Sequence, residues 1–174
     1  MKPYQLRKML YWMLLALLAG AALIGTAGNQ PPGQAASAEI QRGRYLGQVA
    51  ACNDCHTHGY PEAAGQIDEK QWLLGSSLGW SGPWGTTYPG NLRLVMQSLS
   101  EDQWMAQARS ERRPPMPWFL LRDMTDEDLK AIYHYIRSLG SKGEPAPAYA
   151  PPGQAVNTPY IEFFPKNLPQ QVAK

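Results

Sequence analysis

The hydrophobic and polar positions along the chain separate an apolar N-terminal run, a central region with helical patterns and a proline-rich end. The apolar run extends from Met9 to Ile24, and no charged residue follows it until Glu39. The first helical pattern covers about residues 39–51 and places four small or apolar residues on one face: Ile40, Gly43, Leu46 and Ala50. This pattern predicts a helix that packs against a core by that face.

A second helix is predicted from Ser100 to about Ser110. Gln103 lies three residues after Ser100, which is the spacing of a capping box. The consecutive prolines at positions 114 and 115 prevent this helix from continuing, because proline lacks the backbone donor and clashes with the preceding turn.

A third helix is predicted from Thr125 to Gly140. Three acidic residues follow Thr125 directly, and carboxylates in a first turn suit the positive end of the helix dipole. Apolar residues then recur at helical spacing and define a buried stripe: Leu129, Ile132, Tyr133, Ile136 and Leu139.

The remaining regions carry no further regular pattern. Residues 57–99 are rich in turn formers and lack the alternation that strands produce. Seven of the 34 residues from 141 to 174 are proline, although Tyr160 to Phe164 is too apolar to leave in water. We expect an all-α protein in four parts: a signal or membrane anchor (1–28), a linker (29–38), a helical domain (39–140) and a Pro-rich extended tail (141–174).

The apolar run is typical of an export signal or a membrane anchor, because three basic residues precede it: Lys2, Arg7 and Lys8. Its length lies between that of a secretory signal and the roughly 20 apolar residues of a spanning helix. The clean A-x-A pattern, Ala36 to Ala38, comes well after the run, which favours retention. We expect an uncleaved anchor helix, with residues 25–38 as a flexible tether to the domain. The alternative is a cleaved signal. Both place the domain outside the cytoplasm, on the periplasmic side of the membrane.

Composition and charge narrow the class of protein. The chain has 174 residues, of which 44% are hydrophobic, so one domain of ordinary size with tails is expected. The formal net charge is +2, but without the three basic residues before the apolar run Lys plus Arg falls from 16 to 13 against 14 Asp plus Glu. No basic surplus remains to indicate nucleic-acid binding.

The two cysteines of the chain lie in the sequence Cys52-Asn53-Asp54-Cys55-His56. C-x-x-C-H is the attachment signature of c-type haem. Two thiols one turn apart form thioethers to the vinyl groups, and the histidine supplies an imidazole to the iron. Because the motif follows an export segment and a predicted helix, we expect one covalently attached haem c.

Two other kinds of site share part of this pattern. A thioredoxin-like redox site requires a βαβ setting, which the sequence lacks, and does not require His56. A zinc site needs two more ligands. His134 falls opposite the apolar stripe of the third helix and is expected to face solvent, and His58 is expected to be a loop residue.

A thioether ligand opposite His56 would raise the potential of the haem iron. Of the seven methionines, three belong to the export segment, and Met96 and Met105 belong to or adjoin the second helical region, where methionine is usually a core residue. Met116 lies among prolines, in a rigid stretch that suits a ligand held at a fixed distance. Met124 precedes the cap of the third helix, where an apolar residue forms a hydrophobic staple. We favour Met116.

Residues 39–140 resemble a class I c-type cytochrome domain. The resemblance is carried by the CNDCH motif after a helix, a loop with Met116 followed by proline, and the closing helix TDEDLKAIYHYIRSL. The arrangement of these motifs is similar to that in the cytochrome subunits of membrane-bound bacterial dehydrogenases. Those subunits commonly carry several haems, whereas this chain has one C-x-x-C-H motif. The resemblance implies that Cys52 and Cys55 bind haem covalently, that His56 is the proximal ligand and that Met116 is the distal ligand.

The resemblance also implies that the first and last helices cross, which would bring Gly43 against an aromatic residue such as Tyr133, since glycine permits close approach. Tryptophans could line the haem crevice, with Trp84 as a candidate propionate donor. Four arginines flank the Met116 loop and are expected either to neutralise propionates or to be solvated: Arg109, Arg112, Arg113 and Arg122. The carbonyl of Pro61 or Pro83 could orient His56.

The sequence therefore predicts a mono-haem cytochrome that carries single electrons and has no catalytic residues of its own. The expected partners are a dehydrogenase or quinol-oxidising donor and a terminal oxidase or another cytochrome as acceptor. The alternative is a haem-based sensor or small catalytic haem protein, in which Met116 is absent from the iron or easily displaced.

Overall fold

The computed structural model describes Tyr4 and residues 32–167. The chain divides into two compact units, residues 1–36 and 37–174, and apart from the start of its first helix the fold described below is that of the second. Among the described residues no helix has the length and apolar character needed to cross a membrane. The apolar run from Met9 to Ile24, and the anchor expected there, lie outside them.

Helix α2 (Pro32–Val49) begins earlier than the sequence predicts. Residues 33–38 were expected to belong to a linker, yet they are helical and their side chains are exposed. Because these residues bury no apolar face, periodicity could not reveal them. Their alanine-rich composition favours helix, and proline is accepted in a first turn.

Short elements follow α2 and lead to the centre of the fold. Helix α3 (Cys52–His56) contains the cysteine motif and begins after Ala51, whose positive φ of 59° turns the chain sharply. The 3₁₀ helix η1 (Glu69–Gln71) and helix α4 (Leu92–Ser98) lie in the region where only turns were expected.

Helix α5 (Glu101–Ala108) and helix α7 (Asp126–Ser138) confirm the second and third predicted helices. Ser100 and Gln103 form the expected capping box. Thr125 caps α7 by accepting a hydrogen bond from the backbone N–H of Asp128, and Gly140 follows α7 with a φ of +71°. Helix α6 (Trp118–Asp123) occupies the segment between them.

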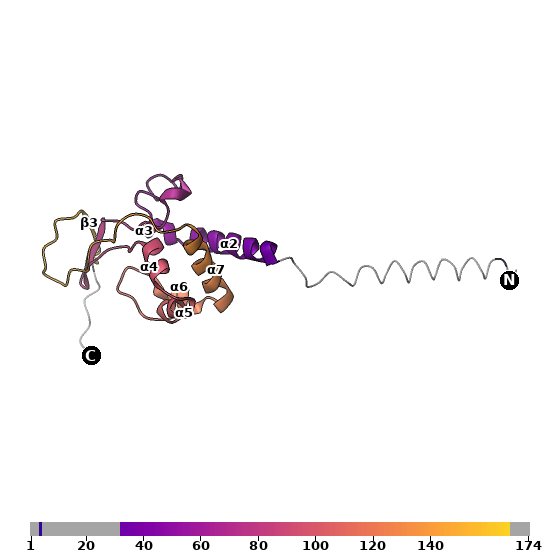
Figure 1. Cartoon of the computed structure of the whole chain (residues 1–174). Coiled ribbons are helices and arrows are strands. Elements are labelled where there is room, and N and C mark those ends of the chain that lie inside the picture. Colours follow the sequence, from indigo (N-terminus) through magenta and orange to yellow (C-terminus); the bar gives the residue numbers. More distant parts are fainter. Residues whose placement is uncertain (1–3, 5–31, 168–174) are drawn as a thin grey trace, which may run out of the picture. The chain divides into compact units, whose positions relative to one another are not determined.

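The core is built around α7, which packs against α4 and α5 (Figure 1). Four residues of the expected stripe are buried, with Leu129, Ile132 and Ile136 each at most 2% exposed and Tyr133 at 5%, whereas Leu139 is only partly buried. Tyr135 of α7 and residues from other parts of the chain complete the cluster: Leu46, Trp72, Leu73, Met96, Trp104 and Ala108. Helix α7 is thus the element to which the rest of the domain is attached.

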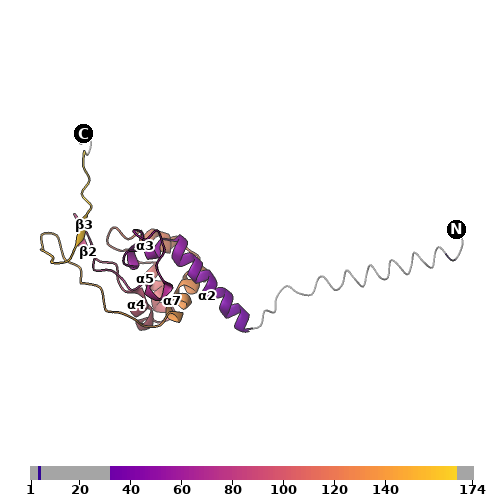
Figure 2. The same ribbon diagram turned by 90° about the horizontal axis from the view of Figure 1, so that it is seen from above.

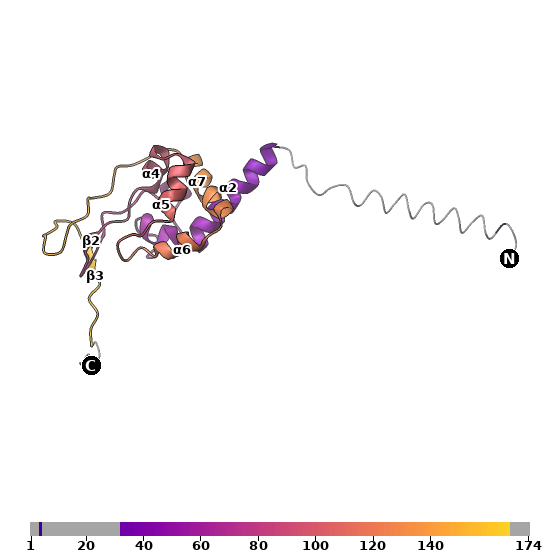
Figure 3. The same cartoon turned by 90° about the horizontal axis from the view of Figure 1, so that it is seen from below.

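The domain is not purely helical, so the all-α prediction is corrected. A small sheet in the order β2-β1-β3 joins β1 (Gly79–Gly82), β2 (Gly85–Thr87) and β3 (Tyr160–Glu162). Strands β1 and β2 pair antiparallel, whereas β1 and β3 pair parallel, with Trp80 opposite Ile161. Strands of three or four residues are too short to show alternation, which is why the sequence pattern missed them. In all three ribbon views the sheet lies away from α7 (Figures 1, 2 and 3).

Candidate functional site

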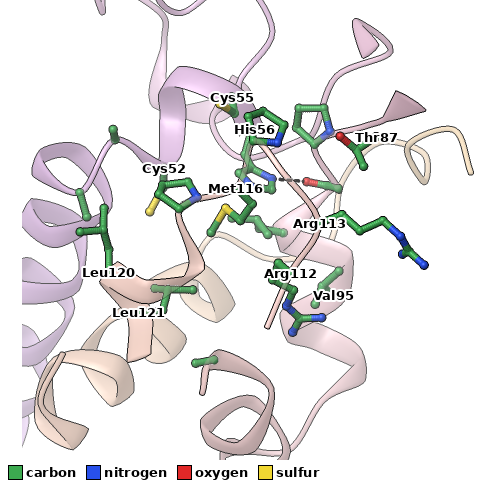
Figure 4. Close-up of a pocket in the computed structure, with 18 of the residues that line it drawn as sticks. Cys52, Cys55, His56, Thr87, Val95, Arg112, Arg113, Met116, Leu120 and Leu121 are labelled. Carbon is green, nitrogen blue, oxygen red and sulfur yellow. Dashed lines mark hydrogen bonds between the residues drawn. The ribbon is translucent and has the colours of Figure 1, made fainter. Parts of the chain in front are cut away.

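The two cysteines face one cavity of about 390 Å³. They lie three residues apart in α3, which places both thiols on the same side of a single helical turn. Figure 4 shows their side chains with His56 and Met116 around the cavity. All four residues that the sequence singled out therefore line the same space.

His56 is oriented by the backbone of a distant loop. Its Nδ1 lies 2.7 Å from the carbonyl oxygen of Gly90 (Figure 4). Because a carbonyl oxygen only accepts, Nδ1 carries the proton and Nε2 keeps its lone pair. The carbonyl that orients His56 is thus neither of the candidates named from the sequence, Pro61 and Pro83. Burial lowers the pKa of His56 although the hydrogen bond to Gly90 opposes this, and the neutral ring is the form that binds metal ions.

The Gly90 carbonyl is held in place by a set of backbone hydrogen bonds around it. The N–H of Gly75 donates to the carbonyl of His56 at 2.7 Å, and the N–H of Ser76 donates to the carbonyl of Pro89 at 3.1 Å. The backbone on both sides of the His56–Gly90 contact is therefore tied to the same segment, which supports the hydrogen bond that orients the imidazole.

Burial raises the pKa of both cysteine thiols, to about 11 for Cys52, which keeps them protonated near neutral pH. No disulfide joins them. A low thiol pKa, which thioredoxin-like catalysis uses, is thus absent.

Met116 lines the cavity from a loop that is fastened to the sheet. The hydroxyl of Thr87, at the end of β2, donates to the carbonyl of Pro114 at 2.8 Å. The N–H of Trp118 donates to the carbonyl of Met116 at 2.9 Å as α6 begins. Met124 also lines the cavity, so cavity position by itself does not separate the two methionines.

The rest of the cavity wall is mostly apolar, and it comes from many parts of the fold. Helix α7 contributes Ile132 and Ile136, and α6 contributes Leu120 and Leu121. Further apolar residues complete the wall: Leu92, Val95, Trp104, Pro115, Pro117, Pro147 and Tyr149. A large and mostly apolar group suits such walls.

Of the tryptophans that the sequence offered as crevice candidates, Trp80 and Trp104 lie on the cavity. Among the described residues Trp84 and Trp118 are not part of its lining. The indole Nε1 of Trp84 is buried and has no hydrogen-bond partner in the described part of the chain.

The four arginines near the Met116 loop divide into two pairs. Arg112 and Arg113 line the cavity. Arg109 instead donates to the carbonyls of Leu121, Arg122 and Met124, and it pairs with Asp126. Arg122 pairs with the adjacent Asp123. Of these four arginines, Arg112 and Arg113 are therefore placed to contact an anionic group in the cavity.

A zinc site is not supported by the described residues, which contain no group of three or more His, Cys, Asp or Glu side chains that could hold a metal ion. His134, which is partly exposed, lies with its Nε2 2.9 Å from an oxygen of Glu101. His58 is exposed, and its Nδ1 lies 3.2 Å from the Ser76 hydroxyl. Both histidines therefore have surface contacts of their own.

Several residues of the site gave no signal in the sequence. Gly90 contributes through a backbone oxygen, which no side-chain pattern reveals. Pro147 and Tyr149 lie in the segment expected to be an extended tail, and Leu120 lies in a helix too short to show periodicity. The pairing of Thr87 with Pro114 depends on tertiary structure.

Residues 40–140 match the sequence model of the cytochrome c family, and the chain therefore belongs to that family. It is also 30% identical over 131 residues to the fructose dehydrogenase cytochrome subunit of Gluconobacter japonicus, an alignment that covers 69% of this chain and 25% of that subunit. The chain thus spans about a quarter of the length of that relative. No solved structure matches the chain.

Membership of this family identifies a haem electron carrier with a covalently attached haem c. The site fits such a group, because two thiols on one helical turn, a neutral imidazole with Nε2 available and a thioether share one mostly apolar cavity.

Proposed function

We propose that the Cys52 and Cys55 thiols would each add across a vinyl double bond of the haem, giving two thioether bonds, and that His56 Nε2 and the Met116 sulfur would hold its iron. The observation that carries this proposal is the convergence of all four side chains on one cavity. They come from two segments that are 60 residues apart in the sequence. When bound, the haem supplies one-electron redox chemistry.

The protein's own residues act by positioning and by excluding water. Gly90 holds the His56 imidazole in one orientation, and Thr87 fastens the Met116 loop. The apolar wall from α6 and α7 lowers the local dielectric, which favours the less charged ferrous site and raises the potential. The chain therefore functions as a mono-haem electron carrier rather than as a catalyst.

We further propose a dehydrogenase or a quinol-oxidising protein as the electron donor, and a terminal oxidase or another cytochrome as the acceptor. The similarity to a dehydrogenase cytochrome subunit supports the first of these partners. The chain would work on the periplasmic side of the cytoplasmic membrane, tethered by an N-terminal helix whose apolar run Met9 to Ile24 lies outside the described residues. The intact mass of the purified protein tests the tether, since a mature terminus near Glu39 would contradict it.

The absorption spectrum of the purified holoprotein tests the function. A carrier with His56 and Met116 on the iron is expected to give a low-spin ferric spectrum with a near-infrared band from the thioether to ferric iron. It is also expected to take up cyanide or imidazole slowly. A high-spin ferric spectrum with rapid uptake of both ligands would instead support the sensor or small catalytic haem protein.

A further inference from the structure

The segment that follows the family domain is fastened along the cavity rather than free. The match to the cytochrome c family ends at residue 140, and the sequence predicted an extended tail from 141 onward. We call residues 141–150 the strap. The strap has no helix or strand of its own, so each of its contacts with the domain has to come from specific side chains or from isolated backbone pairs.

The first fastening is the buried Asn91 side chain, which is 3% exposed. Its amide nitrogen donates to the carbonyls of Lys142 and Glu144 at 2.8 and 3.2 Å. Its oxygen accepts from the N–H of Leu94 at 3.2 Å and so caps α4. Because Asn91 directly follows Gly90, one residue joins the strap to the peptide that orients His56.

The second fastening is a backbone pair at the other end of the strap. Ala150 and Thr86 exchange two hydrogen bonds, of 2.8 and 3.0 Å. A Cβ at Gly85 would come within 2.3 Å of the Ala150 carbonyl, so the strap lies as close to β2 as a glycine permits. Ala150 itself is 3% exposed.

Between these two fastenings the strap reaches the cavity. Pro147 and Tyr149 both line it. The Tyr149 hydroxyl donates to the carbonyl of Trp84 at 2.8 Å. The Arg113 guanidinium lies 4.0 Å from the centre of the Tyr149 ring, within the range of a cation–π contact, and Arg113 also lines the cavity.

The chain beyond the strap keeps it in place. Strand β3 pairs with β1, and the Thr158 and Tyr88 hydroxyls lie 2.5 Å apart. The Phe163 ring lies 5.2 Å from the ring of Trp80, which is itself a cavity residue. The strap is therefore held at both ends and cannot be described as a mobile tail.

We infer that the strap is part of the haem site, with Pro147 and Tyr149 as the wall that keeps water and small ligands from the haem and with Arg113 held at the cavity by the Tyr149 ring. This inference rests on the proposed function, since it requires haem in the cavity. Solvent exposure of a haem stabilises the more charged ferric form, so a wall of this kind raises the reduction potential.

The test compares three variants of the holoprotein by redox titration and by the rate of imidazole binding to ferric haem. Tyr149→Ser removes the ring, and Tyr149→Phe keeps it while removing the hydroxyl. Tyr45→Ser is the matched control, because Tyr45 is a tyrosine of α2 that does not line the cavity. Its exposed fraction is 54%, and that of Tyr149 is 37%.

Tyr149→Ser is expected to lower the potential and to bind imidazole several-fold faster than the wild type. Tyr149→Phe should stay close to the wild type, and Tyr45→Ser should match it. The inference is overturned when Tyr149→Ser has the wild-type potential and rate. That outcome is distinct from failure of the proposed function, in which the wild-type protein itself carries no covalent haem or lacks the low-spin spectrum.

Limited trypsin digestion of the wild-type holoprotein tests the strap without a substitution. Lys142 lies inside the strap, and its carbonyl is bonded to Asn91. Lys166 is an exposed residue beyond β3. Cleavage after Lys166 is expected first, with Lys142 cut on global unfolding. Equal rates of cleavage at the two sites would show that the strap is mobile and would overturn the inference.

Discussion

Two methionines line the cavity, and their remaining contacts distinguish them. Met124 packs against the hydrophobic core cluster, ends α6, and accepts a hydrogen bond from Arg109 through its carbonyl. Met116 is not part of that cluster in the described chain, and its loop is fastened through Pro114 instead. The packing of Met124 agrees with the apolar role that the sequence gave it, so the contacts favour Met116 as the proposed ligand.

Replacing each methionine by alanine separates the two roles. Met116→Ala is expected to keep covalent haem but to change the iron to a high-spin or His-hydroxide form with a lower potential. Met124→Ala should keep the low-spin spectrum and lose about 2 kcal/mol of unfolding free energy, because it removes a partly buried side chain. Visible spectra and denaturant titrations measure these effects. If Met124→Ala converts the spectrum and Met116→Ala does not, the ligand assignment is wrong.

At the scale of elements, the crossing of α2 and α7 fixes the frame around the cavity. An ideal Cβ at Gly43 would lie 1.9 Å from the Ala131 carbonyl oxygen and 2.7 Å from the Tyr135 Cβ. The close approach at Gly43 is therefore present, but its aromatic neighbour is Tyr135, whereas Tyr133 donates its hydroxyl to the carbonyl of Leu99. The expected and the observed aromatic neighbour lie on different faces of α7, since residues two positions apart on a helix point in different directions.

Two glycines of α2 give a matched pair that tests this crossing. Gly43→Ala is expected to destabilise the domain by about 1–3 kcal/mol or more, because the added methyl group must push α2 away from the α7 backbone. Gly47→Ala places its methyl group at an ordinary 3.7 Å from the Tyr135 ring. It should therefore stabilise the helix by about 0.5–1 kcal/mol.

Thermal or urea unfolding of the two holoproteins measures the difference. Similar stabilities for Gly43→Ala and Gly47→Ala would show that α2 does not lie against α7 at this point.

At the scale of the whole molecule, the cavity is continuous with the hydrophobic core, because Trp104, Ile132 and Ile136 belong to both the cavity wall and the core cluster. The haem is thus expected to act as a core component as well as a redox centre.

Loss of covalent attachment is therefore expected to prevent accumulation of the folded protein. The double variant Cys52→Ala and Cys55→Ala should give no haem stain in a denaturing gel and little folded protein, because the unattached group can leave the cavity. Met116→Ala is the control, since it keeps both thiols and should stain fully. Full-strength staining of the double variant would contradict the proposed attachment.

The elements with strong local signals were predicted correctly from the sequence. Helices α5 and α7 have side-chain caps and apolar residues at helical spacing, and both features can be read from neighbouring positions in the sequence. The early start of α2, the short helices α4 and α6 and the sheet were missed. These elements are short or expose their side chains, so no periodic pattern of apolar residues reveals them.

The sequence by itself determined the family, because CNDCH, a proline-flanked methionine and the closing helix are local patterns with specific chemical requirements. Tertiary structure decided the contacts that depend on residues far apart in the chain. It selected Gly90 as the acceptor for His56, and it fastened the strap to Asn91. A backbone carbonyl is present at every residue, so no sequence pattern can identify which one lies 2.7 Å from an imidazole. Only the folded chain brings these groups together.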